Sequence, residues 1–162
     1  MNSRYTIAAL TDLLTVLRDS ERALRACAAA ARGDLLSPLC ARAARQRAGA
    51  ARELARTVWG LGGVVPGCSR SGGPWSDRWS ALGQALACAR EGEILEALER
   101  GESRTLEAYR NALDDYLPEG VREVVTRQFE EAMYTHDEIR HCRLPAPLRP
   151  EGGSPGVQAP SP

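Results

Sequence analysis

The hydrophobic positions between Ile94 and Pro118 recur at the spacing of one face of an α-helix. The members of this apolar stripe are Leu95, Leu98, Leu106, Tyr109, Leu113 and Tyr116. Glu102 falls in the middle of the stripe, at a position where a leucine would be expected. A carboxylate in an apolar core is costly unless it is paired, protonated or bound to a metal. Glu102 therefore needs a partner that the stripe itself does not supply.

The same periodicity predicts the rest of the fold. We expect long helices at about residues 6–32, 35–61, 93–116 and 118–142. A glycine-rich loop at residues 60–75 and a short helix within residues 76–92 separate the second long helix from the third. Trp59, Trp75 and Trp79 gather around this crossover, and we expect them to pin it to the bundle; an exposed tryptophan here would instead mark a partner-binding patch. Tight turns within each pair and one long crossover between the pairs predict an all-α, ferritin-like four-helix bundle.

The chain of 162 residues is long enough for one domain with a hydrophobic core. We assign residues 1–143 to the bundle and residues 144–162 to a disordered tail. The tail has no apolar periodicity and holds six of the ten prolines, a composition that cannot build a packed core.

Composition excludes several classes of function. The 21 basic residues balance the 21 acidic ones, so no electrostatic footprint for nucleic acid or an anionic membrane is present. Every basic residue is arginine, which excludes catalysis by lysine. No apolar run is long enough to span a bilayer, and the first residues lack the pattern of a signal peptide. The five cysteines form no CxxC pair, which favours reduced thiols in the cytoplasm.

Several polar residues fall on the apolar faces of the expected helices. The inward-facing polar set is Glu21, Gln46, Glu102, Gln128 and His136. Counting along each hairpin from its turn places these residues close to a common level, because antiparallel helices rise equally from the turn that joins them. We therefore expect all five side chains to approach one zone in the middle of the bundle.

Four segments carry a resemblance to a known family. They read TIAALTDLLTVLRDSERALR, RELARTVWGLGG, ILEALERGESRTLEAYRNAL and LPEGVREVVTRQFEEAMYTHDEIR. Over about residues 2–143 the chain resembles the ferritin-like superfamily. More closely, it is similar to an uncharacterised bacterial family of ferritin-like four-helix bundles, a domain of unknown function. The resemblance implies a role in bacterial stress physiology.

The resemblance also implies where a metal would bind. In di-iron ferritin-like proteins, two helices each supply a Glu and the other two each supply Glu-x-x-His. Glu21 and Glu102 match the two single carboxylates. Gln46 and Gln128 stand where the other two carboxylates would be, and no histidine follows either of them at the required spacing. Iron and manganese prefer anionic oxygen and imidazole ligands, so this set is incomplete.

Two interpretations of the inward-facing polar set remain open. In the first, Glu21, Glu102 and His136 bind iron or manganese, with Gln46 and Gln128 beside them, in a metal-dependent oxidoreductase or an iron-handling protein. In the second, the carboxylates pair with arginines or amides in a polar core network that fixes the helix register. Because canonical ligands are missing, we favour a non-catalytic or weakly metal-binding bundle that self-associates as a dimer.

Overall fold

The computed structural model describes residues 3–32, 34–67 and 76–144, and these residues form five helices and no strand. The elements are α1 (Ser3–Ala30), α2 (Leu36–Gly60), α3 (Ser80–Cys88), α4 (Glu91–Asp114) and α5 (Glu119–Arg143). The prediction of an all-α bundle is confirmed, and each long helix begins and ends within about three residues of its expected bounds. The predicted tail lies outside the described residues, apart from Leu144.

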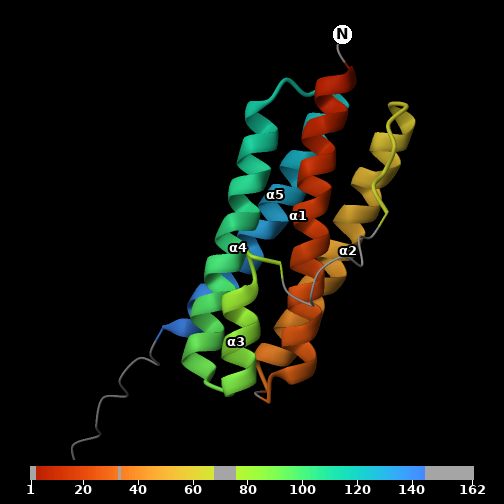
Figure 1. The fold of residues 1–162 in the computed structure, drawn as a ribbon. Coiled ribbons are helices and arrows are strands. Elements are labelled where there is room, and N and C mark those ends of the chain that lie inside the picture. The colour runs from red at the N-terminus through yellow and green to blue at the C-terminus, as the bar shows by residue number, and fades with distance from the viewer. Residues whose placement is uncertain (1–2, 33, 68–75, 145–162) are drawn as a thin grey trace, which may run out of the picture.

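The four long helices form two antiparallel hairpins. Figure 1 shows α1 and α5 running in one direction and α2 and α4 in the other. α1 packs against α2 and α4, and α5 packs against α4 and α2. Each long helix therefore has two antiparallel neighbours, while α2 and α4 lie diagonally opposite and their backbones do not approach each other. Because α2 ends and α4 begins at opposite ends of the bundle, the connection between them has to return along its length (Figure 1).

The core consists of two apolar clusters, one in each half of the bundle. The lower cluster, at the α3 end in Figure 1, contains Ala23, Leu24, Cys27, Leu36, Leu39, Cys40, Ala43, Ala44, Trp79, Leu82, Ala85, Ile94, Leu95, Ala97, Leu98 and Ile139. The upper cluster contains Leu10, Leu13, Leu14, Leu17, Ala50, Ala51, Leu54, Val58, Leu106, Tyr109, Ala112, Leu117, Val125 and Ala132. Burying each large aliphatic side chain contributes about 1.5–3 kcal/mol, so these clusters supply most of the driving force for folding.

Trp79 anchors the connection before α3 to the backbone of α4. Its side chain is 2% exposed, and a Cβ added at Gly101 would lie 2.3 Å from the Trp79 ring. The indole can take this position because Gly101 has no side chain. Trp59 is 71% exposed, so the expectation that it also pins the crossover is wrong. Trp75 lies outside the described residues.

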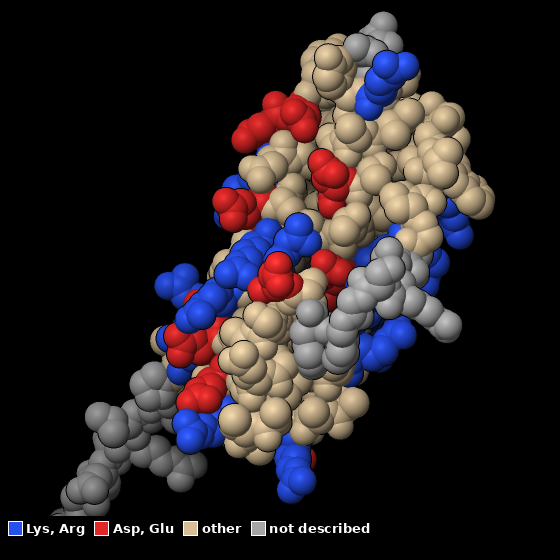
Figure 2. All heavy atoms as spheres, viewed as in Figure 1, with Lys and Arg blue, Asp and Glu red and all other residues tan. Residues whose placement is uncertain are grey.

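Charges of both signs cover the bundle. Figure 2 shows arginine and acidic side chains interspersed on the face that it views. Some form pairs between helices, as Arg143 does with Glu99, and others pair within one helix, as Arg100 does with Glu96. Such exposed pairs contribute about 0–1 kcal/mol each. No helix of the described part of the chain is both long and apolar enough to cross a membrane.

We expect Gly101→Ala to destabilise the protein, although alanine favours a helix more than glycine does. The added methyl group must displace the Trp79 ring, and overpacking of this kind costs about 1–3 kcal/mol. Gly49→Ala in α2 is the matched control, because an added Cβ there meets only the mobile end of Arg52 at 4.0 Å. In this control the free energy of unfolding should rise by about 0.5–1 kcal/mol, because alanine favours the helix more than glycine does. Urea unfolding of both variants measures the contrast, and equal shifts would contradict the packing of Trp79 on α4.

Candidate functional site

One layer of buried polar side chains crosses the core between the two apolar clusters. Each long helix contributes one residue that hydrogen-bonds to another helix: Ser20 from α1, Arg47 from α2, Glu102 from α4 and Thr135 from α5, whereas the buried Thr105 of α4 bonds only to its own helix. On every helix this residue lies between a member of the upper cluster and a member of the lower cluster. We call these four residues the polar layer. Glu102, the polar residue that interrupts the α4 stripe, thus belongs to a feature shared by all four helices.

The centre of the polar layer is a buried ion pair. Arg47 is 1% exposed and Glu102 is 0% exposed, and the Arg47 Nη2 group donates a hydrogen bond to Glu102 Oε2. Ser20 Oγ donates to the other carboxylate oxygen, Oε1, at 2.8 Å. Both oxygens of Glu102 therefore have donors, and the guanidinium supplies the countercharge that a buried carboxylate needs.

Arg47 makes this pair across the diagonal of the bundle. The backbones of α2 and α4 are not neighbours, so only a long side chain from one of them can reach the other. Arginine has that length together with a permanent charge. Its Nε atom is buried and has no hydrogen-bond partner among the described residues. The free-energy cost of removing the guanidinium from water is therefore only partly offset. The pair therefore fixes the position of α2 relative to α4, and its net contribution to the free energy of unfolding is small.

Gln46 extends the polar layer toward α5. Its Oε1 atom accepts hydrogen bonds from Thr135 Oγ1 at 2.9 Å and from Arg47 Nη1 at 3.3 Å. Its Nε2 atom donates to Glu131 Oε2 at 3.3 Å. The amide can serve both sides because it is a donor and an acceptor at once. Gln46 therefore joins the central ion pair to α5, with which the two charged side chains form no hydrogen bond among the described residues.

A second group of hydrogen bonds lies around Gln128 on α5. Its Nε2 atom donates to Glu53 Oε2 at 2.7 Å, and the Tyr109 hydroxyl donates to its Oε1 atom at 3.4 Å. Arg127 Nη2 donates to both oxygens of Glu53 at 2.7 Å. Burial raises the pKa of Glu53, but the hydrogen bonds from Gln128 and Arg127 outweigh it, so the net pKa lies below its ordinary value. Burial raises the pKa of Tyr109, which keeps its hydroxyl a donor.

Of the five inward-facing polar residues expected from the sequence, Gln46, Glu102 and Gln128 belong to these hydrogen-bonded groups. The structure does not bring Glu21 or His136 into them. Glu21 is 20% exposed and pairs with Arg25 on its own helix. His136 lies with its Nε2 atom 2.9 Å from Ser103 Oγ. Because successive helical residues are rotated by about 100°, Ser20 faces the core where Glu21 was expected to.

The residues around Glu102 do not fit a metal site. Within the described part of the chain, no group of three or more His, Cys, Asp and Glu side chains is arranged to hold a metal ion. The guanidinium of Arg47 lies beside the Glu102 carboxylate and would repel a divalent cation there. Glu21 and His136, the other expected ligands, make separate hydrogen bonds. The metal-binding interpretation thus stays a prediction, and the geometry around Glu102 speaks against it.

Arg47 and Ser20 are two of the three polar-layer residues that the sequence interpretation missed; the third is Thr135, between Ala132 and Ile139 on α5. Arg47 follows Ala43 by four positions and precedes Ala50 by three, which places it on the apolar stripe of its helix. Ser20 holds the corresponding place between Leu17 and Leu24. A polar residue at a core position of a helical stripe was the signal that identified Glu102, and it was present at both of these positions.

A groove of about 540 Å³ lies apart from the polar layer, between α1, α4 and the segment before α3. Its two arginines are already engaged, because Arg78 pairs with Asp19 at 3.2 Å and Arg104 donates to the carbonyl oxygen of Arg78 at 3.0 Å. Asp12 and Glu107 also line the groove. With both signs of charge and engaged arginines, this groove does not form an anion site.

The comparisons with known proteins identify a family without a defined activity. A family model described as Domain of unknown function (DUF2383) matches residues 5–115. The matched residues include Ser20, Arg47 and Glu102, while α5 lies beyond them. No curated protein matches the chain. The expectation of a family with a domain of unknown function is confirmed.

We expect removal of one partner from the central ion pair to cost more than removal of both. Arg47→Met or Glu102→Leu leaves the remaining group buried without its partner, and the expected loss is about 3–5 kcal/mol. The double variant Arg47→Met/Glu102→Leu should lose far less, because no buried charge remains. Glu21→Gln is the matched control on a solvent-facing pair and should change stability by about 0.5 kcal/mol or less.

Urea unfolding of the four variants and the parent protein gives the coupling energy as a double-mutant cycle. Additive effects of Arg47→Met and Glu102→Leu would show that the two side chains do not interact in the core.

Proposed function

The chain belongs to the family described as Domain of unknown function (DUF2383), and we propose that it acts as a non-catalytic, self-associating helical bundle of the ferritin-like type. The observation that carries this proposal is the buried pair of Arg47 and Glu102. In a working di-metal bundle the core carboxylates face a metal. Here the core carboxylate faces an arginine, a permanent cation that occupies the place where a metal would have to approach the carboxylate.

The connectivity supports the ferritin-like assignment. All neighbouring long helices are antiparallel, and α1 and α5 share one direction (Figure 1). Two hairpins can be arranged in this way only if the chain returns along the bundle between them, which is the single long crossover of ferritin-like folds. The polar layer also lies in the bundle core, where such folds place their ligands.

The amides at positions 46 and 128 support a structural role. Each of them both donates and accepts hydrogen bonds between helices, Gln46 toward Glu131 and Thr135, and Gln128 toward Glu53 and Tyr109. An amide that bonds in both directions is well suited to fix the distance between two helices. We also propose a cytoplasmic location, supported by the free thiols of Cys27, Cys40, Cys88 and Cys142. A contribution to bacterial stress physiology follows from the resemblance alone.

Metal analysis tests the non-catalytic assignment. We expect protein purified without chelators to contain iron and manganese well below one ion per chain, because Arg47 supplies the countercharge of Glu102. Glu102→Ala should lower the melting temperature, while Glu21→Ala should leave it nearly unchanged. Stoichiometric iron or manganese that is lost in both variants would overturn the assignment. It would support the alternative, a metal-dependent oxidoreductase or iron-handling protein that uses Glu21, Glu102 and His136.

One end of the bundle offers a surface for self-association. Four large apolar side chains are exposed where α1 begins and where α2 and α4 end, and we call them the end patch: Tyr5, Trp59, Val64 and Tyr116. Aromatic residues are enriched in protein interfaces, and three of these four side chains are aromatic. We propose a second copy of the chain as the occupant. The formal net charge of zero supports this choice, since two copies do not repel each other.

We expect light scattering to give the mass of a dimer, and Trp59→Glu to shift the protein to the monomer by placing a charge in the contact. Leu35→Glu is the matched control, because Leu35 is equally exposed but lies at the opposite end of α2. A monomer at every protein concentration would remove self-association from the proposal. A dimer that resists Trp59→Glu and is lost in Leu35→Glu would move the contact to the other end.

A further inference from the structure

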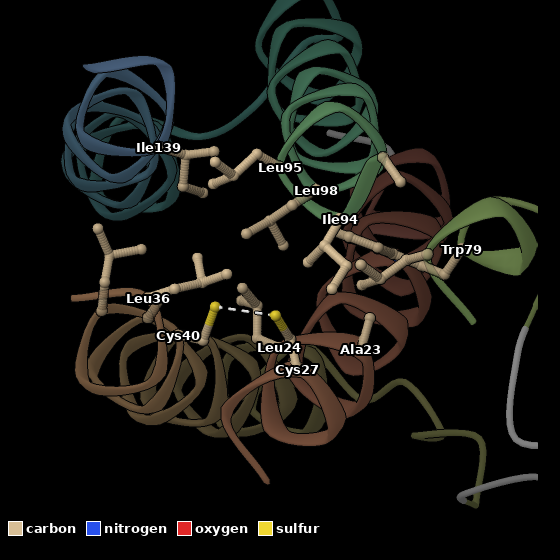
Figure 3. Close-up of a cluster of buried hydrophobic side chains, with 14 of the residues drawn as sticks. Ala23, Leu24, Cys27, Leu36, Cys40, Trp79, Ile94, Leu95, Leu98 and Ile139 are labelled. Atoms are coloured by element: carbon tan, nitrogen blue, oxygen red, sulfur yellow. Dashed lines mark hydrogen bonds between the residues drawn. The ribbon is translucent and has the colours of Figure 1, made fainter. Parts of the chain in front are cut away.

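Two buried cysteines face each other across the first hairpin. Cys27 lies near the end of α1 and Cys40 near the beginning of α2, and neither side chain is exposed. Their Sγ atoms are 3.3 Å apart, and Figure 3 shows the two sulfurs pointing toward one another within the lower cluster. The sulfurs of a disulfide are about 2.05 Å apart, so a shift of about 1.2 Å would join them. The pair is therefore close to bonding geometry while both thiols are free.

The hydrogen bond between the thiols gives them different roles. Cys40 donates its S–H group to Cys27 Sγ. This bond lowers the pKa of Cys27 against the opposing effect of burial. The same bond raises the pKa of Cys40, and burial raises it further. Because the thiolate is the nucleophile, this direction of the hydrogen bond favours Cys27 as the sulfur that attacks and Cys40 as the sulfur that resolves the product.

A small cavity lies at the same end of the bundle. It has a volume of about 230 Å³, and its lining includes Ala31 and Leu36. Ala31 donates its backbone N–H to the carbonyl oxygen of Cys27 at 2.8 Å, and Leu36 lies one helical turn before Cys40. A water molecule occupies about 30 Å³ in the liquid, so the cavity has room for hydrogen peroxide, which is small and neutral. Neither cysteine lines this pocket, so a hydroperoxide has to pass its wall to reach the two buried sulfurs.

We propose that Cys27 and Cys40 form an oxidation site that reduces a small hydroperoxide and becomes a disulfide between α1 and α2. The Cys27 thiolate attacks one oxygen of hydrogen peroxide, the O–O bond breaks, and the released hydroxide takes up a proton to become water. Cys40 then attacks the sulfur of the Cys27 sulfenic acid. The S–O bond breaks, the S–S bond forms, and the Cys40 proton leaves with the second water. Two thiols lose two electrons, and one peroxide becomes two waters.

This site is separate from the proposed bundle function. The polar layer and the end patch contain neither cysteine, so failure of either proposal leaves the other standing. The product would close the short turn between α1 and α2 with a covalent bond, and a cross-link of this kind restricts the unfolded chain.

The test uses the full chain with Cys68→Ser, Cys88→Ser and Cys142→Ser, which leaves only Cys27 and Cys40. The folded protein is treated with hydrogen peroxide, then unfolded, alkylated and weighed by mass spectrometry. We expect loss of both free thiols, a mass lower by two hydrogens, and a peptide that links Cys27 to Cys40. The melting temperature of the oxidised form should rise by roughly 5 °C and return after reduction.

Single replacements separate the roles of the two sulfurs. In the same background, Cys40→Ala should accumulate a sulfenic acid on Cys27 that dimedone traps, while Cys27→Ala should give much less adduct. Circular dichroism checks that both variants are folded. The matched control keeps only the exposed Cys88 and Cys142, with Cys27→Ala, Cys40→Ala and Cys68→Ser, and should form no internal disulfide. The proposal fails if Cys27 and Cys40 stay free at peroxide concentrations that oxidise the exposed thiols, or if they bond only in urea.

Discussion

The need to neutralise a buried carboxylate governs the centre of this bundle. Glu102 lies on α4 and its countercharge, Arg47, lies on α2, the helix diagonally opposite. The pair can form only when the two hairpins are aligned along their length, because one guanidinium has to meet one carboxylate. An apolar core tolerates sliding of one hairpin against the other far better, since leucines contact leucines in several registers. Buried polar groups of this kind have the best-attested role in specifying register, and the polar layer has the geometry for it.

The same pair supplies the countercharge of the buried carboxylate from within the chain. A cluster of core carboxylates needs cations, and a bound metal is one solution. In this chain amides replace two of the four expected carboxylates, which lowers the negative charge of the core. Ser20 rather than Glu21 faces the centre, and this neutral side chain lowers the negative charge of the core further. A single arginine then balances the single remaining carboxylate at the diagonal. The charges at the centre add to zero without an ion from solution, and this balance leaves no electrostatic demand for one.

The sequence predicts the helices and the polar core position of Glu102, but it does not predict the partners. Helical spacing is a local property, so the four long helices could be located within a few residues. The stripe of a core-facing helix is more than about 100° wide, so spacing alone does not separate Ser20 from its neighbour Glu21. Arg47 on α2 reaches Glu102 on α4, although the backbones of these two helices are not neighbours. Counting residues along a hairpin aligns only adjacent helices, so it does not find this contact. The packing of Trp79 on Gly101 is missed for the same reason, because it joins separate elements.

The polar layer also divides the bundle into two parts that carry different chemistry. The cysteine pair lies in the lower cluster, and the end patch lies beyond the upper cluster. All four long helices contribute residues to both clusters, and the two cysteines lie on α1 and α2. A disulfide near the α1–α2 turn would therefore act on the end patch most directly through these two helices. The polar layer should limit any movement of α1 and α2 that a disulfide causes, because Ser20 and Arg47 hydrogen-bond these helices to Glu102 in the middle of the bundle. Oxidation at one end and association at the other are for this reason expected to be largely independent.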